Sequence, residues 1–221
     1  MPAAISTFSC NCKELSKGIH KEKQYDEERV NDLQHLIQLI RSGRIGSASH
    51  IRVHRPRTLR MLWWTFDYSY DHHFLVTEAT ENKLTIIHYA LKRLSRIILL
   101  KGVAEIIQNS VDFSNAGEVL DFDAGVYLVT AENYPQTPQE KFEAIDRARR
   151  RLGERQYSVF YNNCDCFVSW TLNGFSYSRQ AMNAEGLLLY IGIVTRYCLK
   201  TYRKLQTFKN FISNIRRVFR G

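Results

Sequence analysis

Residues 50–130 constrain the fold most, because they break into short runs of β-branched and aromatic residues separated by turn residues. Runs of this kind are typical of β-strands. Their spacing favours an antiparallel meander over a parallel sheet, in which strands alternate with long helices. The sequence therefore predicts strands at residues 51–54, 74–77, 84–89, 104–108 and 126–130.

A helical pattern precedes this region. Within residues 25–40 apolar residues recur at helical spacing among charged ones, and Ser42 with Gly43 supplies a stop signal. The apolar residues of this stripe are Val30, Leu33, Leu36, Ile37 and Ile40. We expect residues 1–45 to form a mobile leader followed by an amphipathic helical arm.

Two more helices are predicted after the strands. Thr137 and Pro138 open the first and Gly153 ends it. Its expected buried stripe is Phe142, Ile145, Ala148 and Leu152. Asn162 or Asn163 caps the second helix, which ends at Gly174 and carries the apolar residues Phe167, Val168, Trp170 and Leu172. The sum is an α+β fold, a small antiparallel sheet packed by helices.

The net charge of +9 comes almost wholly from the end of the chain. Residues 1–185 hold 23 basic and 22 acidic residues, whereas residues 186–221 hold eight basic residues and no acidic one. The C-terminal tail, residues 179–221, also carries apolar residues at helical spacing, namely Phe208, Phe211, Ile212, Ile215, Val218 and Phe219. This pattern predicts a basic amphipathic helix.

Such a helix favours a phospholipid membrane surface as the partner, with its apolar face at the acyl boundary and its Lys and Arg residues near anionic headgroups. The other interpretation is a solvated helix that packs on the domain. No apolar run reaches the ~18 residues of a membrane span, so the tail is expected to lie on the membrane. No groove-reading motif or aromatic platform indicates a nucleic acid as partner.

Five cysteines, at positions 10, 12, 164, 166 and 198, and an N-terminus without a secretory signal favour free thiols in a reducing compartment. We therefore expect a cytoplasmic protein that is peripherally associated with membranes. One residue separates Cys10 from Cys12 and Cys164 from Cys166, whereas zinc knuckles have two. Spare thiols are the better interpretation of these pairs.

Cys164 is the candidate nucleophile. A thiol reacts as the thiolate, and a helix start or an adjacent histidine lowers its pKa. Because Cys164 follows the Asn162-Asn163 cap signal, we expect it in the first turn, where free amide N–H groups can also hold an oxyanion. A depressed pKa would let alkylation at mildly acidic pH single out this thiol. Taken alone, the residue also fits a small buried apolar side chain.

Histidines that can serve as a base lie on two predicted strands. His72 and His73 begin the run at 74–76, and His88 ends the run at 84–87. On their own, His88 also fits a core histidine, and the first two also fit strand-edge polar residues or, with Asp71, a metal site. The remaining histidines have no partner signal and are interpreted as solvated; they are His20, His35, His50 and His54.

These blocks resemble the lecithin:retinol acyltransferase-like (LRAT-like) domain, a family of the permuted NlpC and papain-like thiol enzymes. The resemblance covers residues 46–178: a Tyr-x-His strand at 70–76, a second strand with His88, and a block at 149–168 that leads into Cys164. The last block is the most specific. The resemblance implies a catalytic domain of permuted papain-like type, with the nucleophilic cysteine at a helix N-terminus.

The resemblance also implies that Cys164 accepts the acyl group, that His72 is the general base and that His88 orients it. It implies neither a cofactor nor a metal. Neighbouring residues of a strand face opposite sides, so only one of His72 and His73 can reach the thiol. The position two residues after Tyr70 favours His72.

Three features depart from the family's pattern. Asp165 stands where the motif has Glu, and Cys166 stands where it has His. The turn at residues 78–82 is longer than usual, which leaves the pairing of the two histidine strands open.

The implied activity is a thiol-dependent acyl transfer from membrane phospholipids through a cysteine thioester. With water as the acceptor it is a phospholipase A activity, and with an amine it is an N-acyltransferase activity. The altered motif at Asp165 and Cys166 supports an alternative, a non-catalytic LRAT-like interaction module with a membrane-binding tail. A peptidase, as in other branches of the thiol enzymes, is the third hypothesis.

Overall fold

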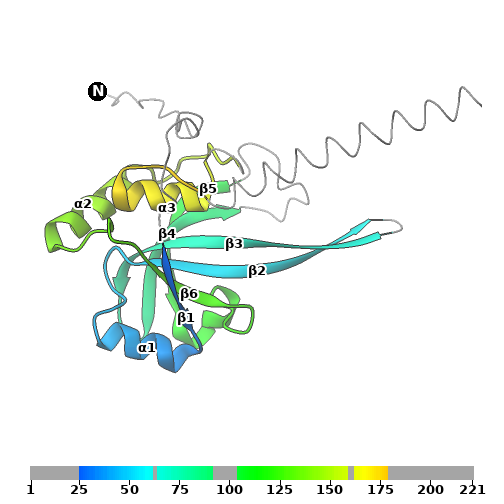
Figure 1. Cartoon of the computed structure of the whole chain (residues 1–221), viewed down its shortest axis with the longest axis horizontal. Coiled ribbons are helices and arrows are strands. Elements are labelled where there is room, and N and C mark those ends of the chain that lie inside the picture. The colour runs from blue at the N-terminus through cyan, green and yellow to red at the C-terminus, as the bar shows by residue number, and fades with distance from the viewer. Residues whose placement is uncertain (1–24, 62–63, 92–103, 159–161, 179–221) are drawn as a thin grey trace, which may run out of the picture. The chain divides into compact units, whose positions relative to one another are not determined.

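The computed structural model describes residues 25–61, 64–91, 104–158 and 162–178 (Figure 1). These residues belong to one structural unit. Its elements are, in order, β1 (Asp26–Val30), α1 (Leu33–Arg41), β2 (His50–Met61), β3 (Trp64–Ala79), β4 (Lys83–Leu91), β5 (Ala104–Asp112), the short 3-10 helix η2 (Phe113–Glu118), β6 (Val126–Thr130), α2 (Pro138–Arg149) and α3 (Cys164–Asn173). The predicted α+β class is confirmed.

The six strands form one antiparallel sheet in the order β1-β6-β2-β3-β4-β5. β2 and β3 pair from His50 with Leu75 to Met61 with Trp64. The pairs between β3 and β4 extend only from Leu75 to Ala79, with an irregularity between Val76 and Glu78. β2 and β3 therefore continue together beyond their neighbours as a two-stranded ribbon (Figure 1).

Each predicted strand is present in the sheet. The bounds of β6 agree with the prediction, whereas β2 to β5 are longer than expected. The longer strands contain charged and polar residues such as Arg55 and Ser110, because pairing with a neighbouring strand satisfies the backbone whatever the side chain.

The sheet has a separate hydrophobic core on each face. On one face α1 contributes Leu36 and Leu39, which pack with sheet residues that include Ile51, Val53, Phe74, Val76, Leu84 and Ile86. On the other face α2 and α3 contribute Ala144, Ala148, Phe167, Val168 and Leu172, which pack with Leu75, Ile87, Tyr89 and Ile106. Because side chains of a strand alternate between faces, neighbouring residues of β3 enter different cores.

The single helix expected over residues 25–40 is a strand followed by a helix. β1 pairs with β6 at the edge of the sheet, and Asp32 then caps α1 by accepting a hydrogen bond from the amide of His35 at 2.7 Å. The helical spacing from Leu33 onward correctly predicts α1, but Val30 is buried as the last residue of β1. The segment thus adds an edge strand to the sheet and a helix that packs on one face of it.

The second predicted helix is present as α2, with Thr137 and Glu140 forming a reciprocal capping box. Of its expected buried stripe, Ile145 and Ala148 are buried. The prediction is wrong for Phe142, which is 62% exposed, and for Leu152, which is 41% exposed and lies beyond the end of the helix. Ala144, which the predicted stripe omits, is buried in the core on this face of the sheet, whereas Phe142 lies outside that core.

Among the described residues, no helix combines the length and apolar character that crossing a membrane would require. The expected tail helix, residues 179–221, lies outside the described residues.

Gly174 ends α3, as the sequence predicts, and its conformation explains why glycine stands there. Its φ of 78° is left-handed, and its amide donates to the carbonyl oxygen of Trp170. A Cβ added at this residue would meet no atom within 4 Å. Backbone conformation alone therefore disfavours a larger residue.

We predict that Gly174→Ala lowers the free energy of unfolding by about 1 kcal/mol, because alanine is strained in the left-handed region. Urea denaturation followed by circular dichroism measures the effect. The matched control is Gly46→Ala, since Gly46 also has open space for a Cβ but no positive φ. Equal effects of the two substitutions would contradict the assignment of the cost to backbone conformation.

Candidate active site

Cys164 is the first residue of α3. Of the two asparagines predicted as caps, Asn163 is the N-cap, and its side-chain oxygen accepts a hydrogen bond from the amide of Cys166 at 2.9 Å. Its Nδ2 donates to Oγ of Ser178 at 2.8 Å, which ties the helix start to the segment after α3. The predicted position of Cys164 in the first turn is therefore present in the structure.

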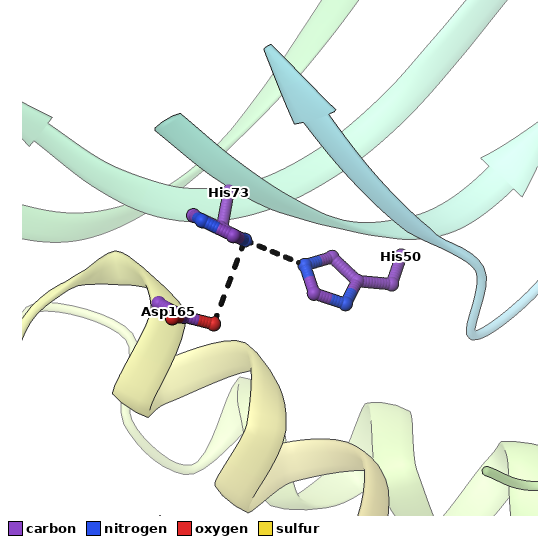
Figure 2. A group of neighbouring side chains, drawn as sticks. All are labelled: His50, His73 and Asp165. Atoms are coloured by element: carbon purple, nitrogen blue, oxygen red, sulfur yellow. Dashed lines mark hydrogen bonds and ion pairs between the residues drawn. The ribbon is translucent and has the colours of Figure 1, made fainter. Parts of the chain in front are cut away.

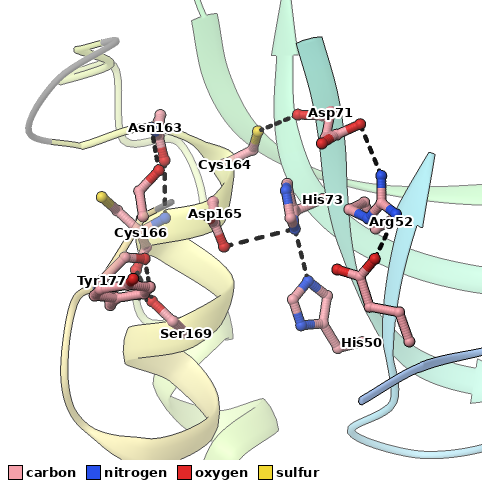
Figure 3. Close-up of polar contacts among 12 residues, drawn as sticks. His50, Arg52, Asp71, His73, Asn163, Cys164, Asp165, Cys166, Ser169 and Tyr177 are labelled. Carbon is pink, nitrogen blue, oxygen red and sulfur yellow. Dashed lines mark hydrogen bonds and ion pairs between the residues drawn. The ribbon is translucent and has the colours of Figure 1, made fainter. Parts of the chain in front are cut away.

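The thiol of Cys164 lies against the backbone of β3. Sγ is 3.6 Å from the carbonyl oxygen of Asp71, to which it donates (Figure 3). The amide of His73 donates toward the sulfur. The amides of Asp165 and of Cys164 itself also face it. β3 pairs with β4 only from Leu75 onward, so this part of its edge is available to the start of α3.

Burial raises the pKa of Cys164 to about 12. The three amides lower the pKa and the carboxylate of Asp165 raises it, but loss of hydration is the largest effect, since the residue is 4% exposed. The expectation of a depressed pKa at a helix start is therefore not met. The resting thiol is protonated, and reaction requires a base that removes its proton during attack.

His73 is the imidazole beside this thiol. Its Nδ1 is 2.8 Å from Nε2 of His50 and 3.6 Å from Oδ1 of Asp165 (Figure 2). The other ring nitrogen, Nε2, points toward the side on which Cys164 lies (Figure 3). The base candidate is thus held at one nitrogen and presents the other to the nucleophile.

Neighbouring groups favour one proton assignment for these rings. Nδ1 of His50 is 2.8 Å from the hydroxyl of Tyr134, so one proton lies in each of the two contacts of His50. A carboxylate repels a ring lone pair, and Asp165 therefore favours the tautomer in which Nδ1 of His73 carries the proton. His73 then donates to His50, His50 donates to Tyr134, and Nε2 of His73 keeps the lone pair of a base.

An ion-pair cluster holds the strand segment that contacts the thiol. Arg52 donates to Asp71 at 2.9 Å (Figure 3) and to Glu27 at 2.6 Å. His54 contacts the same oxygen of Asp71 at 2.9 Å. The guanidinium of Arg52 also lies 4.0 Å from the ring centroid of Tyr127. Charges from β1 and β2 thereby fix the residue whose carbonyl oxygen accepts from Cys164.

A second polar cluster fixes the residues before α3. Glu154 accepts hydrogen bonds from Tyr89 at 2.6 Å, from two guanidinium nitrogens of Arg151 at 2.7 Å each, and from Asn162 at 2.8 Å. Arg151 also donates to Asn162 at 2.9 Å and lies over the ring of Trp170 on α3. Since Asn162 directly precedes the cap residue, this cluster positions the helix start and its cysteine.

The structure brings His72 and His88 together but not to Cys164. Nε2 of His72 is 2.9 Å from Nδ1 of His88, and both rings contact Phe74 edge-on. Phe74 belongs to the core under α1, whereas Cys164 belongs to the core under α2 and α3. None of the contacts described for the two histidines reaches the thiol. Strand alternation places His73, not His72, on the side of α3.

Both members of this pair are held in the neutral form. Burial lowers the pKa of His72 well below its ordinary value, and the neighbouring His88 lowers it further. Burial also lowers the pKa of His88 to about 4. His72 and His88 therefore share one hydrogen bond as two neutral imidazoles.

Three residues of the site were missed by sequence reasoning. His50 was interpreted as solvated, yet it is 2% exposed, and that prediction is wrong. Its place directly before the apolar run at 51–54 was the available signal, since alternation from Ile51 puts it on the opposite face. Asp165 was noted only as a motif change, and nothing in the sequence marked Tyr134.

Comparisons with known proteins agree with the resemblance. The family model described as "Lecithin retinol acyltransferase" matches residues 44–177. The search of curated proteins and the search of solved structures each gave no match.

We predict that iodoacetamide labels Cys164 slowly at mildly acidic and neutral pH, and faster as the pH rises toward the pKa of about 12. A pKa some three units above that of an ordinary thiol reduces the thiolate fraction at pH 7 by about 1000-fold. Peptide-level mass spectrometry of the folded chain measures the rate, with glutathione as the reference thiol. Preferential labelling of Cys164 at pH 6 would contradict the raised pKa.

Proposed function

Because the chain belongs to the lecithin retinol acyltransferase family, we propose that it transfers acyl groups through a thioester on Cys164, with His73 as the general base. The observation that carries this proposal is the alignment of the Cys164 thiol, His73 and the pair formed by His50 and Asp165 along one face of the sheet. A nucleophile, a base and groups that hold the base are the minimum for thiol acyl transfer.

The first half of the reaction forms the thioester. Sγ of Cys164 attacks the carbonyl carbon of an acyl ester, and its proton moves to Nε2 of His73. The resulting imidazolium is stabilised by the carboxylate of Asp165 and by its hydrogen bond to His50. The ester C–O bond then breaks, and the leaving alcohol takes the proton from His73.

The second half releases the acyl chain. An acceptor, water or an amine or alcohol, loses its proton to Nε2 of His73 and attacks the thioester carbonyl. The C–S bond breaks and Cys164 regains the proton. In both halves the amides at the start of α3 supply donors for the oxyanion, since they already surround the sulfur.

Membrane phospholipid is the acyl donor that we propose. The resemblance to acyltransferases supports an ester of a fatty acid, and the basic tail supports a substrate held in an anionic surface. The eight basic residues within 186–221 and the apolar stripe of the tail fit a peripheral membrane attachment. Water as the acceptor gives a phospholipase A, and an amine gives an N-acyltransferase.

One observation favours a second candidate function, a non-catalytic module. The thiol of Cys164 is buried and its pKa is raised to about 12, which are also features of an inert cysteine. In this alternative the domain retains its fold for binding a partner. Formation of an acyl adduct on Cys164 separates the two candidates.

We predict that incubation of the full chain with phosphatidylcholine vesicles adds the mass of one acyl chain, which hydroxylamine removes. Intact-mass spectrometry measures the adduct. Cys164→Ala abolishes it, whereas Cys166→Ala, a matched change two residues away, retains it. Absence of both adduct and released fatty acid would favour the non-catalytic module.

We predict different effects from the two neighbouring histidines, so that His72 serves as the control for the proposed base His73. His73→Gln should slow thioester formation by about 100-fold or more, the usual contribution of a general base. His72→Gln should slow it far less, because that side chain contacts His88 and Phe74 on the opposite face. The reverse order of effects would restore the base role that the resemblance implies for His72.

We predict that the full chain floats with vesicles containing phosphatidylserine, and that a chain ending at residue 178 does not. Attraction between the basic tail and anionic headgroups is the reason, so 0.5 M salt should weaken binding. Flotation on a sucrose gradient measures the bound fraction. Equal binding of both chains would contradict the role proposed for the tail.

A further inference from the structure

Three side chains of types that bind metal ions meet at the proposed base, which is one of them. His50 comes from β2, His73 from β3 and Asp165 from α3 (Figure 2). One ligand atom of each lies within 4.8 Å of the others, and their residues are 2%, 5% and 7% exposed. The atoms that meet are Nε2 of His50, Nδ1 of His73 and Oδ1 of Asp165.

The separations of these atoms are close to those around one small ion. Zinc binds imidazole nitrogen and carboxylate oxygen at 2.0–2.2 Å, so tetrahedral ligand atoms lie about 3.3–3.5 Å apart. The two nitrogens are 2.8 Å apart and the His73 nitrogen is 3.6 Å from the oxygen, values on either side of that range. All three ligand atoms lie within 4.8 Å of one another, so the cluster is close to the size that one ion requires.

The chemistry of the set selects a class of ion. Two imidazoles and one carboxylate suit zinc, iron(II), cobalt(II) and related ions, whereas calcium and magnesium prefer oxygen ligands. Tyr134 supplies the outer contact that such sites use, since its hydroxyl accepts the Nδ1 proton of His50 and leaves the lone pair of Nε2 toward the cluster.

We propose that His50, His73 and Asp165 bind a divalent transition-metal ion, and that this ion inhibits the thiol chemistry. The ion takes the lone pair of Nδ1 of His73, so the ring proton moves from Nδ1 to Nε2. Nε2 then has no lone pair with which to accept the proton of Cys164. The inhibition rests on the proposed function; the binding rests on the cluster alone.

Metal binding is tested on the full chain without any assay of activity. Calorimetry with zinc should give one site that His50→Gln or Asp165→Asn weakens by at least 100-fold. His54→Gln is the matched control, because this residue lies on the same strand and contacts Asp71 instead of the cluster. Tyr134→Phe should weaken binding by about 10-fold while every ligand remains.

Cobalt(II) identifies the ligands by spectroscopy. Binding at the cluster gives weak visible bands without a thiolate charge-transfer band, and Cys164→Ala leaves the spectrum unchanged. The binding proposal is overturned if His50→Gln and His54→Gln bind equally well, or if the spectrum is that of a thiolate site. Circular dichroism of each variant checks that the fold is retained.

Inhibition of thioester formation by the metal ion is measured separately from binding. Zinc at the concentration that fills the site should reduce thioester formation by at least 10-fold in the wild type, and a chelator should restore it. Zinc that binds without slowing thioester formation overturns the inhibitory role alone. A chain that binds zinc but forms no thioester at all contradicts the proposed function and leaves the metal site standing.

Discussion

The pleat of β3 is the constraint on which the rest of this structure depends. Successive side chains of a strand face opposite sides, so His72 and His73 enter different layers of the molecule. The first meets His88 and the core under α1, and the second meets His50 and Asp165 under α3. A slip of one residue in the pairing of β3 with β2 would exchange these positions and move His73 away from the thiol.

Two polar clusters maintain that register from opposite ends of the site. Arg52 joins Glu27 and Asp71, so three strands are linked at the point where the thiol meets the backbone. Glu154 joins Tyr89, Arg151 and Asn162, which ties β4 to the residues before α3. Each carboxylate is surrounded by donors in a half-buried setting, where leaving one partner unpaired is costly. The thiol and the imidazole are therefore held by groups that take no part in the chemistry.

Much of the architecture follows from local patterns in the sequence. The strand runs, the Thr137 and Asn163 caps and the glycine at 174 are all determined by neighbours within a few residues. The strand at residues 26–30 was not predicted because a short edge strand acquires its conformation from its partner β6. Its one apolar residue, Val30, also fits the helical spacing of the residues that follow. The prediction that Phe142 is buried is wrong because helical spacing does not reveal which stripe of a helix packs against the sheet.

The site was less accessible to sequence reasoning than the fold. The cap signal predicts the place of Cys164 at a helix start. Which of His72 and His73 lies on its side depends on which face α3 covers, a property of tertiary packing. His50 and Tyr134 lie 23 and 84 residues from their partners His73 and His50, so no local pattern connects them. The raised pKa of Cys164 likewise comes from burial, which outweighs the helix-start amides that the sequence does reveal.

The neutral pair of His72 and His88 makes the fold sensitive to acid. Both pKa values are lowered in the folded chain, that of His88 to about 4, whereas unfolding returns each imidazole to about 6.5. The unfolded chain therefore binds more protons below pH 6.5, and the stability present above that pH is lost as pH falls through the folded values. For each histidine the loss approaches about 1.4 kcal/mol per pH unit. Acidification below pH 6.5 thus destabilises the layer beneath α1, on the side of the sheet away from the thiol.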